Sequence, residues 1–212
     1  VSKHLKGVVV ASTDKAYGNH DELPYNEDTP LLGLFPYDAS KACADILTRS
    51  YSLTFGLRAA VTRNANIYGP GDMNFSRLIP DAIRCVLQKI PLEIRSDGRM
   101  ERDFMFVEDA VNGYLNLAEA LERDEIVGQA FNFGTQQPIS VLDLCTKIQD
   151  ISGSEIPPHI LNTAKYEIPK QFLDTHKARQ LLGWEIHHTL EDGLRKSIDW
   201  YRELFNRAPY LF

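Results

Sequence analysis

Short apolar runs alternate with longer amphipathic stretches along most of the chain. The apolar run at 8–11 lies between a glycine and three polar residues, which is typical of a buried parallel strand. A second apolar run covers 57–63. Between about 37 and 55, apolar residues recur about every 3.6 positions, which predicts a helix that ends at Gly56. The order strand, helix, strand predicts a right-handed crossover in a parallel sheet.

The same alternation continues to the end of the chain and predicts the α/β class throughout. The segment 19–36 is rich in Pro, Asp, Glu and Gly and has no helical period, so we expect a long loop of the kind that often carries function. The segment 152–174 contains three prolines and is the feature of the sequence that comes nearest to a domain boundary. We expect further helices at about 77–88, 107–121, 141–151, 175–182 and 190–204, and extended segments near 92–94, 103–106 and 130–132.

The composition is that of an ordinary globular protein of one domain, or of one domain and a small lobe. The chain has 212 residues, of which 43% are hydrophobic and 25% charged, enough to bury a core. The net charge of -6 argues against a nucleic-acid surface or an anionic membrane as partner. The apolar runs are shorter than a membrane span and no signal pattern is visible, so we expect a soluble, cytoplasmic protein.

The cysteines and the paired histidines are given no chemical role. Cys43, Cys85 and Cys145 are odd in number and widely spaced, so they are interpreted as reduced core thiols. The side chains of the adjacent His187 and His188 diverge on any regular element, and we expect no metal site.

The first candidate chemistry lies at the start of the predicted helix. Tyr37 and Lys41 stand four residues apart, so both project from one helix face toward one ligand. A nearby ammonium stabilises the phenolate, which is the form of tyrosine that acts as a base, and lysine also binds ribose hydroxyls. A solvated surface pair is the alternative for this spacing alone.

The residues that precede this pair give it a context. Ser12, Thr13, Asp14 and Lys15 follow the first buried strand, and a Tyr-Gly pair follows them. The arrangement resembles the extended short-chain dehydrogenase/reductase family of NAD-dependent nucleotide-sugar epimerases and dehydratases. The resemblance implies that Thr13 hydrogen-bonds the reacting sugar hydroxyl, that Tyr37 and Lys41 contact NAD, and that Tyr37 is the base.

The resemblance extends to the substrate side. The segment 63–72 is similar to the family's R-x-x-N-x-Y-G-P pattern and implies that Asn66 contacts a sugar diphosphate. By the same resemblance Arg77 opens the substrate loop and helix, and Arg102 holds the diphosphate, for which a guanidinium fork is suited. The alternatives are an ion pair between Arg102 and its neighbour Asp103, and a helix cap at 108–109.

Asp14 and Lys15 bear on the reaction. In the family, epimerases need the Ser/Thr, Tyr and Lys, whereas 4,6-dehydratases add two residues directly after the Ser/Thr. Asp14 fits the acid that expels the C6 hydroxyl. The dTDP-glucose type has glutamate at the next position, and Lys15 instead looks like the CDP-glucose 4,6-dehydratases, where it either acts as a neutral base or orients Asp14.

The expected function is therefore a nucleotide-sugar 4,6-dehydratase, with a 4-epimerase and a non-catalytic nucleotide-sugar or partner binder as alternatives. The family's glycine-rich NAD fingerprint does not occur in these residues. We therefore expect the C-terminal part of a doubly wound, Rossmann-like sheet plus a small α/β substrate-binding lobe. Residues 1–72 and parts of 103–135 are assigned to the core, and 73–102 and 136–212 mainly to the lobe. The family also implies a homodimer through the helix of Tyr37.

Overall fold

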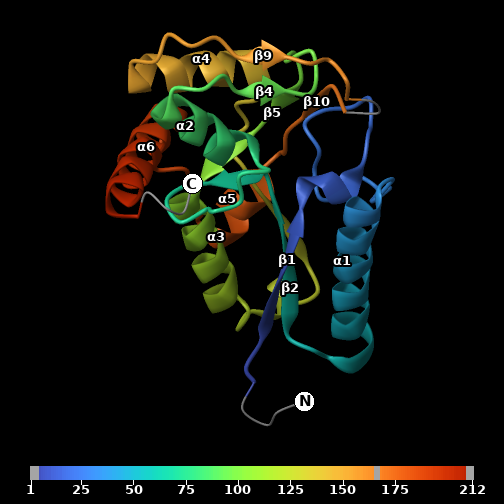
Figure 1. Ribbon diagram of the computed structural model, residues 1–212. Coiled ribbons are helices and arrows are strands. Elements are labelled where there is room, and N and C mark those ends of the chain that lie inside the picture. The colour runs from blue at the N-terminus through green and yellow to red at the C-terminus, as the bar shows by residue number, and fades with distance from the viewer. Residues whose placement is uncertain (1–4, 165–167, 209–212) are drawn as a thin grey trace.

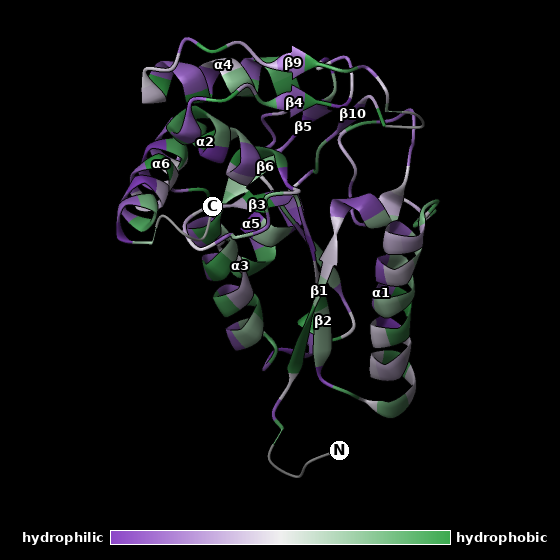
Figure 2. Ribbon diagram, viewed as in Figure 1, coloured by the Kyte–Doolittle hydropathy of each residue, from purple (hydrophilic) through white to green (hydrophobic). Residues whose placement is uncertain are grey.

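The protein is described by a computed structural model that covers residues 5–164 and 168–208. Its central sheet has three parallel strands in the order β1 (Val8–Thr13), β2 (Ala59–Asn64), β7 (Ala130–Phe133). The register pairs Ser12 with Arg63 and Thr13 with Asn64, so both strands end at the same edge. In Figure 2 the polar residues that follow β1 gather at the upper end of this sheet.

Helices cover both faces of the sheet. α1 (Pro36–Phe55) packs on one side of β1 and β2, and α3 (Val107–Ala120) lies on the other (Figure 1). A proline in the first turn starts α1, and Gly56 ends it in the left-handed conformation with φ 67°. This helix connects β1 to β2, as the strand-helix-strand pattern predicts.

A second group of elements lies beyond the carboxyl ends of the central strands (Figure 1). Its helices α2 (Leu78–Gln88), α4 (Val141–Ser152) and α6 (Leu190–Arg207) bury one apolar cluster that includes Ile83, Leu144 and Ile198. α5 (His176–Leu182) packs instead on β7. The described part of the chain also forms three short sheets: β3 (Asn66–Tyr68) with β6 (Phe104–Phe106), β4 (Glu93–Ile94) with β9 (His159–Ile160), and β10 (Lys170–Gln171) with β5 (Glu101–Arg102) and β8 (Ile139–Ser140).

Two short 3-10 helices, η1 (Asp14–Tyr17) and η2 (Asp124–Ile126), follow β1 and α3. The helices predicted from periodicity are all present, with bounds that differ by at most a few residues. No helix among the residues described is both long and apolar enough to cross a membrane.

The cysteines differ in environment. Cys85 and Cys145 are buried, and burial raises the pKa of the Cys145 thiol to about 11. Cys43 is exposed, so its interpretation as a core thiol is wrong. The reason is the orientation of α1, whose sheet-facing side carries Ala42 and Asp45 while Cys43 points outward.

Candidate active site

The carboxyl end of β1 turns directly into η1 and buries two of the predicted site residues. Thr13 accepts a hydrogen bond from the Lys15 amide at 3.4 Å, and its hydroxyl donates to Asp14 Oδ1 at 3.0 Å. Asp14 is fully buried, and its other oxygen, Oδ2, has no hydrogen-bond partner among the residues described. An unpaired buried carboxylate oxygen is costly to a fold, so its presence marks a position available to a ligand.

Lys15 connects this strand end to the start of β3. Its ammonium donates to Asn66 Oδ1 at 3.0 Å and lies 3.8 Å from Asp14 Oδ1. The amide group of Asn66 is fixed in turn, because its Nδ2 donates to the Asp103 carbonyl at 3.1 Å. The structure therefore brings Thr13, Asp14, Lys15 and Asn66 together.

The predicted Tyr-Lys pair lies on the adjacent helix. Lys41 Nζ donates to the Ala11 carbonyl of β1 at 3.1 Å, and the Ser12 hydroxyl donates to the Lys41 carbonyl at 3.3 Å. These two bonds hold the first turns of α1 against the end of β1. Tyr37, one turn before Lys41, is 55% exposed, so a ligand can reach its ring. The bond to the Ala11 carbonyl ties Lys41 to the strand backbone, and Tyr37 is exposed to solvent.

Gln171 contributes to the site from a distant part of the chain. Its side-chain amide donates to the Asp14 carbonyl at 2.9 Å, and the residue is 1% exposed. In the pairing of β10 with β5 it lies opposite Arg102, whose guanidinium donates to the Glu101 carbonyl at 2.9 Å. No local sequence pattern indicates a role for Gln171, because its bond to Asp14 spans 157 positions.

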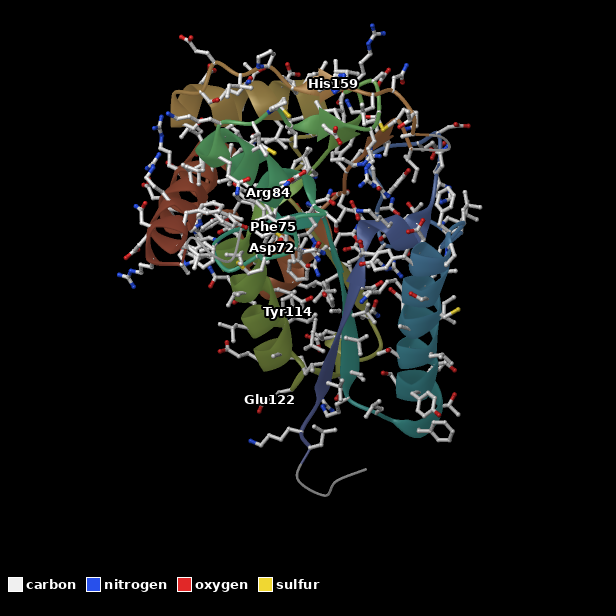
Figure 3. The ribbon with its side chains drawn as sticks, in the orientation of Figure 1. Asp72, Phe75, Arg84, Tyr114, Glu122 and His159 are labelled. Atoms are coloured by element: carbon white, nitrogen blue, oxygen red, sulfur yellow. The ribbon has the colours of Figure 1, made fainter. Side chains whose placement is uncertain are left out.

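Arg77 lies in a different part of the structure from these groups. Its guanidinium pairs with Asp72 at 3.1 Å in an exposed loop. Figure 3 shows Asp72 and Phe75 of this loop close to Arg84 of α2, and the Arg84 guanidinium lies 5.5 Å from the Phe75 ring centre. Among the residues described, no hydrogen bond or ion pair joins Arg77 to the Thr13 and Asn66 group.

The two aspartates of the 102–109 block both contact distant parts of the chain. Asp103 is buried and accepts from the Thr135 and Gln136 amides at 2.9 and 3.0 Å, while burial raises the pKa of its carboxyl. Its role is thus to anchor the 135–136 turn. The expected helix cap at 108–109 is wrong, since Phe106 is the capping residue and Asp109 accepts instead from the His187 and His188 amides.

No three His, Cys, Asp or Glu side chains in the described part of the chain are grouped so as to hold a metal ion.

Comparison with known proteins identifies the class to which this fold and site belong. Residues 2–134 match the model of the family described as NAD dependent epimerase/dehydratase family. The chain belongs to this family, as the motifs at Thr13 and Tyr37 predict.

Three proteins similar to this chain are named for dehydratase or epimerase activities. It is 31% identical over 208 residues to a trifunctional UDP-glucose 4,6-dehydratase, 3,5-epimerase and reductase of Arabidopsis thaliana, covering 96% of this chain and 30% of that protein. It is 30% identical over 203 residues to the UDP-glucuronate 4-epimerase of Thermodesulfobacterium geofontis, covering 94% and 60%. The crystal structure of UDP-glucuronic acid 4-epimerase from Bacillus cereus, in complex with UDP-glucuronic acid and NAD, superposes with a TM-score of 0.86 at 27% identity, covering 95% and 63%.

These matches confirm the Rossmann-like α/β fold and the family of nucleotide-sugar enzymes. The relatives include both 4,6-dehydratases and 4-epimerases. The chain spans less than two thirds of the length of each of the three.

Proposed function

We propose that these residues form the catalytic and sugar-binding part of a nucleotide-sugar 4,6-dehydratase that uses NAD. The observation that carries the proposal is the buried Asp14 at the end of β1. The Thr13 hydroxyl holds one of its oxygens, and the other has no hydrogen-bond partner within residues 5–164 and 168–208. Dehydration needs a proton donor for the departing C6 hydroxyl, and a 4-epimerase does not. Asp14 supplies a carboxyl beside the residue proposed to bind the sugar.

The residues present fit the nicotinamide end of NAD. Lys41 uses one of its three ammonium hydrogens on the Ala11 carbonyl, which leaves donors for ribose hydroxyls. Tyr37 is exposed on the same helix face. Bound NAD would supply the hydride acceptor for oxidation at C4 and the hydride donor for reduction at C6.

The chain's own groups then account for the proton movements. Tyr37 accepts the proton of the sugar O4 as a general base, and Thr13 hydrogen-bonds the same hydroxyl. The ketone formed at C4 acidifies the proton on C5. Asp14 donates its proton to the C6 oxygen as the C6–O bond breaks, and the amine of Lys15, after releasing its own proton to solvent, accepts the proton from C5. Water leaves and a double bond forms between C5 and C6.

We propose that Lys15, Asn66 and two arginines position the nucleotide sugar. The Lys15 ammonium lies between Asp14 and Asn66, so we propose that it orients Asp14 and Asn66 toward the sugar. Asn66 and Arg102 bind the diphosphate, and Arg77 reaches it from the loop before α2. The Asp-Lys pair favours a CDP-hexose among the nucleotide hexoses. Residues 73–102 and 136–212 then form most of the sugar-nucleotide lobe, on a core made by 1–72 and parts of 103–135.

We propose further that the full-length protein is a homodimer. The outward side of α1 carries apolar side chains that are more than half exposed: Ile46, Leu47, Tyr51, Leu53 and Phe55. Exposed apolar side chains gathered along one helix are typical of a protein interface.

The second candidate is a 4-epimerase, because the relatives named for UDP-glucuronate 4-epimerisation share the fold. The two reactions differ in product mass. Full-length protein is incubated with CDP-, dTDP-, UDP- and GDP-hexoses and the products are weighed by mass spectrometry. We expect a product lighter by one water, with the alkali-induced absorbance of a 4-keto-6-deoxy sugar. A C4 epimer of unchanged mass contradicts the proposal and supports the epimerase.

A further inference from the structure

An unexpected charge lies in β2, a strand of the central sheet whose six residues are all buried. Arg63 is 1% exposed in β2, and its Nε and Nη2 donate to the two carboxylate oxygens of Asp45 at 2.7 and 3.0 Å. Asp45 is fully buried on the sheet-facing side of α1. The bidentate geometry fixes the helix against the strand in direction as well as in distance.

The remaining guanidinium nitrogen reaches a third element. Arg63 Nη1 donates to the Tyr17 hydroxyl at 2.8 Å and to the Glu27 carbonyl at 3.0 Å. The Tyr17 hydroxyl donates in turn to Asn132 Oδ1 of β7 at 2.7 Å. Burial raises the pKa of Tyr17, against the opposing effect of Arg63, so the hydroxyl keeps the proton that it donates to Asn132.

Two of the three partners of Arg63, Asp45 and Tyr17, belong to elements that carry proposed catalytic groups. Asp45 lies four residues after Lys41 and eight after Tyr37 on α1, about one and two helical turns away. Tyr17 ends the 3-10 helix that begins at Asp14. One guanidinium thus connects the helix that carries the base to the turn that carries the acid.

We propose that Asp45, Arg63 and Tyr17 are positioning residues that set the placement of Tyr37 and Lys41 relative to Thr13 and Asp14, an inference that rests on the proposed function. A buried ion pair adds little net stability compared with apolar side chains of similar volume, so its main consequence here is geometric. Displacement of catalytic groups by about 1 Å can lower a rate by about 100-fold.

The sharpest test removes one oxygen atom. Tyr17→Phe in the full-length protein keeps the buried ring and deletes the link between Arg63 and Asn132. We expect kcat to fall by about 10- to 100-fold while KM for the nucleotide sugar changes by less than about threefold. The matched control is Tyr68→Phe, which removes another buried hydroxyl, one that donates to the Leu190 carbonyl at 3.1 Å, and should leave kcat nearly unchanged.

A second pair of variants tests the carboxylate. Asp45→Asn breaks the bidentate pair, and Asp45→Glu restores the charge and should recover part of the lost kcat. Asp109→Asn is the control, because Asp109 is equally buried and accepts from backbone amides at another place in the fold. If Asp45→Asn does not fold, the comparison of kcat between Tyr17→Phe and Tyr68→Phe tests the positioning role by itself.

A readout that needs no turnover separates this inference from the proposed reaction. Amide resonances of Tyr37 and Lys41 should move in Tyr17→Phe and stay in place in Tyr68→Phe. A wild-type protein that converts no nucleotide hexose contradicts the proposed function, while these resonances still decide the positioning role. The positioning role is overturned if kcat falls equally in the two tyrosine variants. It is also overturned if the Tyr37 and Lys41 resonances do not move in Tyr17→Phe.

Discussion

At the scale of single residues, the candidate site depends on buried polar groups at the ends of strands. The Asp14 side chain and backbone are held separately, the side chain by Thr13 and the backbone carbonyl by Gln171. Both contacts are short and buried, so each orients the proposed acid. The contact with Gln171 is not predictable from local sequence.

Replacing Gln171 by leucine should change the placement of Asp14 while leaving the Asp14 side chain chemically intact. The substitution leaves the buried Asp14 carbonyl without its side-chain donor, which should lower the free energy of unfolding by about 1 to 3 kcal/mol. We expect kcat for dehydration to fall as well. The measurement is urea denaturation together with the dehydration assay. Gln137→Leu, at an exposed position, is the control and should change stability by less than about 0.5 kcal/mol; an equal effect of both variants contradicts the role given to Gln171.

The sequence predicts the proposed catalytic residues but not the residues that hold them in place, and the reason is physical. Thr13, Asp14, Tyr37 and Lys41 fall in local motifs, because a strand end and a helix start each impose a fixed spacing. The partners that hold them come from distant positions, as with the Asp14–Gln171 bond across 157 positions. The charge of Arg63 inside an apolar strand indicates a buried partner but does not say that this partner is Asp45.

At the scale of elements, α1 shows that an apolar stripe need not face the core. The stripe predicts the helix correctly, yet Ile46, Leu47 and Leu53 point away from the sheet, while Asp38, Ala42, Asp45 and Ser52 face it. The sheet-facing side satisfies the polar ends of β1 and β2 instead. The apolar side is therefore the surface proposed for the dimer.

A charge on this surface should weaken self-association. Leu47→Arg in the full-length protein places an unpaired charge at the proposed interface, and we expect the dimer dissociation constant to rise at least about tenfold, or about 1.4 kcal/mol. Sedimentation equilibrium measures it. Leu115→Arg is matched in exposure, at 55% against 58%, and lies on α3, so it should have little effect. A monomeric wild type, or the same shift in both variants, contradicts the dimer through α1.

Element boundaries follow from local signals where such signals exist. Gly56 ends α1, Gly153 ends α4, and a capping box at Thr189 and Asp192 starts α6. The two-residue strands β4, β5, β8, β9 and β10 have no period of their own, because two positions cannot show alternation. Their pairings are set by the loops that bring them together.

At the scale of the whole molecule, three apolar clusters among the described residues support one site, the smallest formed by Tyr17, Tyr25, Ala65 and Leu173. The cluster around Phe131, Leu117 and Trp184 underlies the parallel sheet, and the cluster of α2, α4 and α6 forms the second group of elements. The proposed acid, base and sugar contacts lie at the carboxyl ends of β1 and β2 and at the start of α1, where ligands of open α/β sheets bind. The parallel sheet was predictable from the strand-helix-strand order, whereas the contact of β10 with the site was not.

The central claim is that Asp14 makes the site a dehydratase. Asp14→Asn keeps the shape of the side chain and removes its proton-donating acid. The most direct measurement is a single turnover of the full-length variant with its nucleotide hexose, following reduced-nicotinamide absorbance and loss of water by mass spectrometry. We expect oxidation at C4 to persist while water loss falls by about 100- to 10,000-fold. Water loss at the wild-type rate would contradict the assignment of Asp14 as the acid.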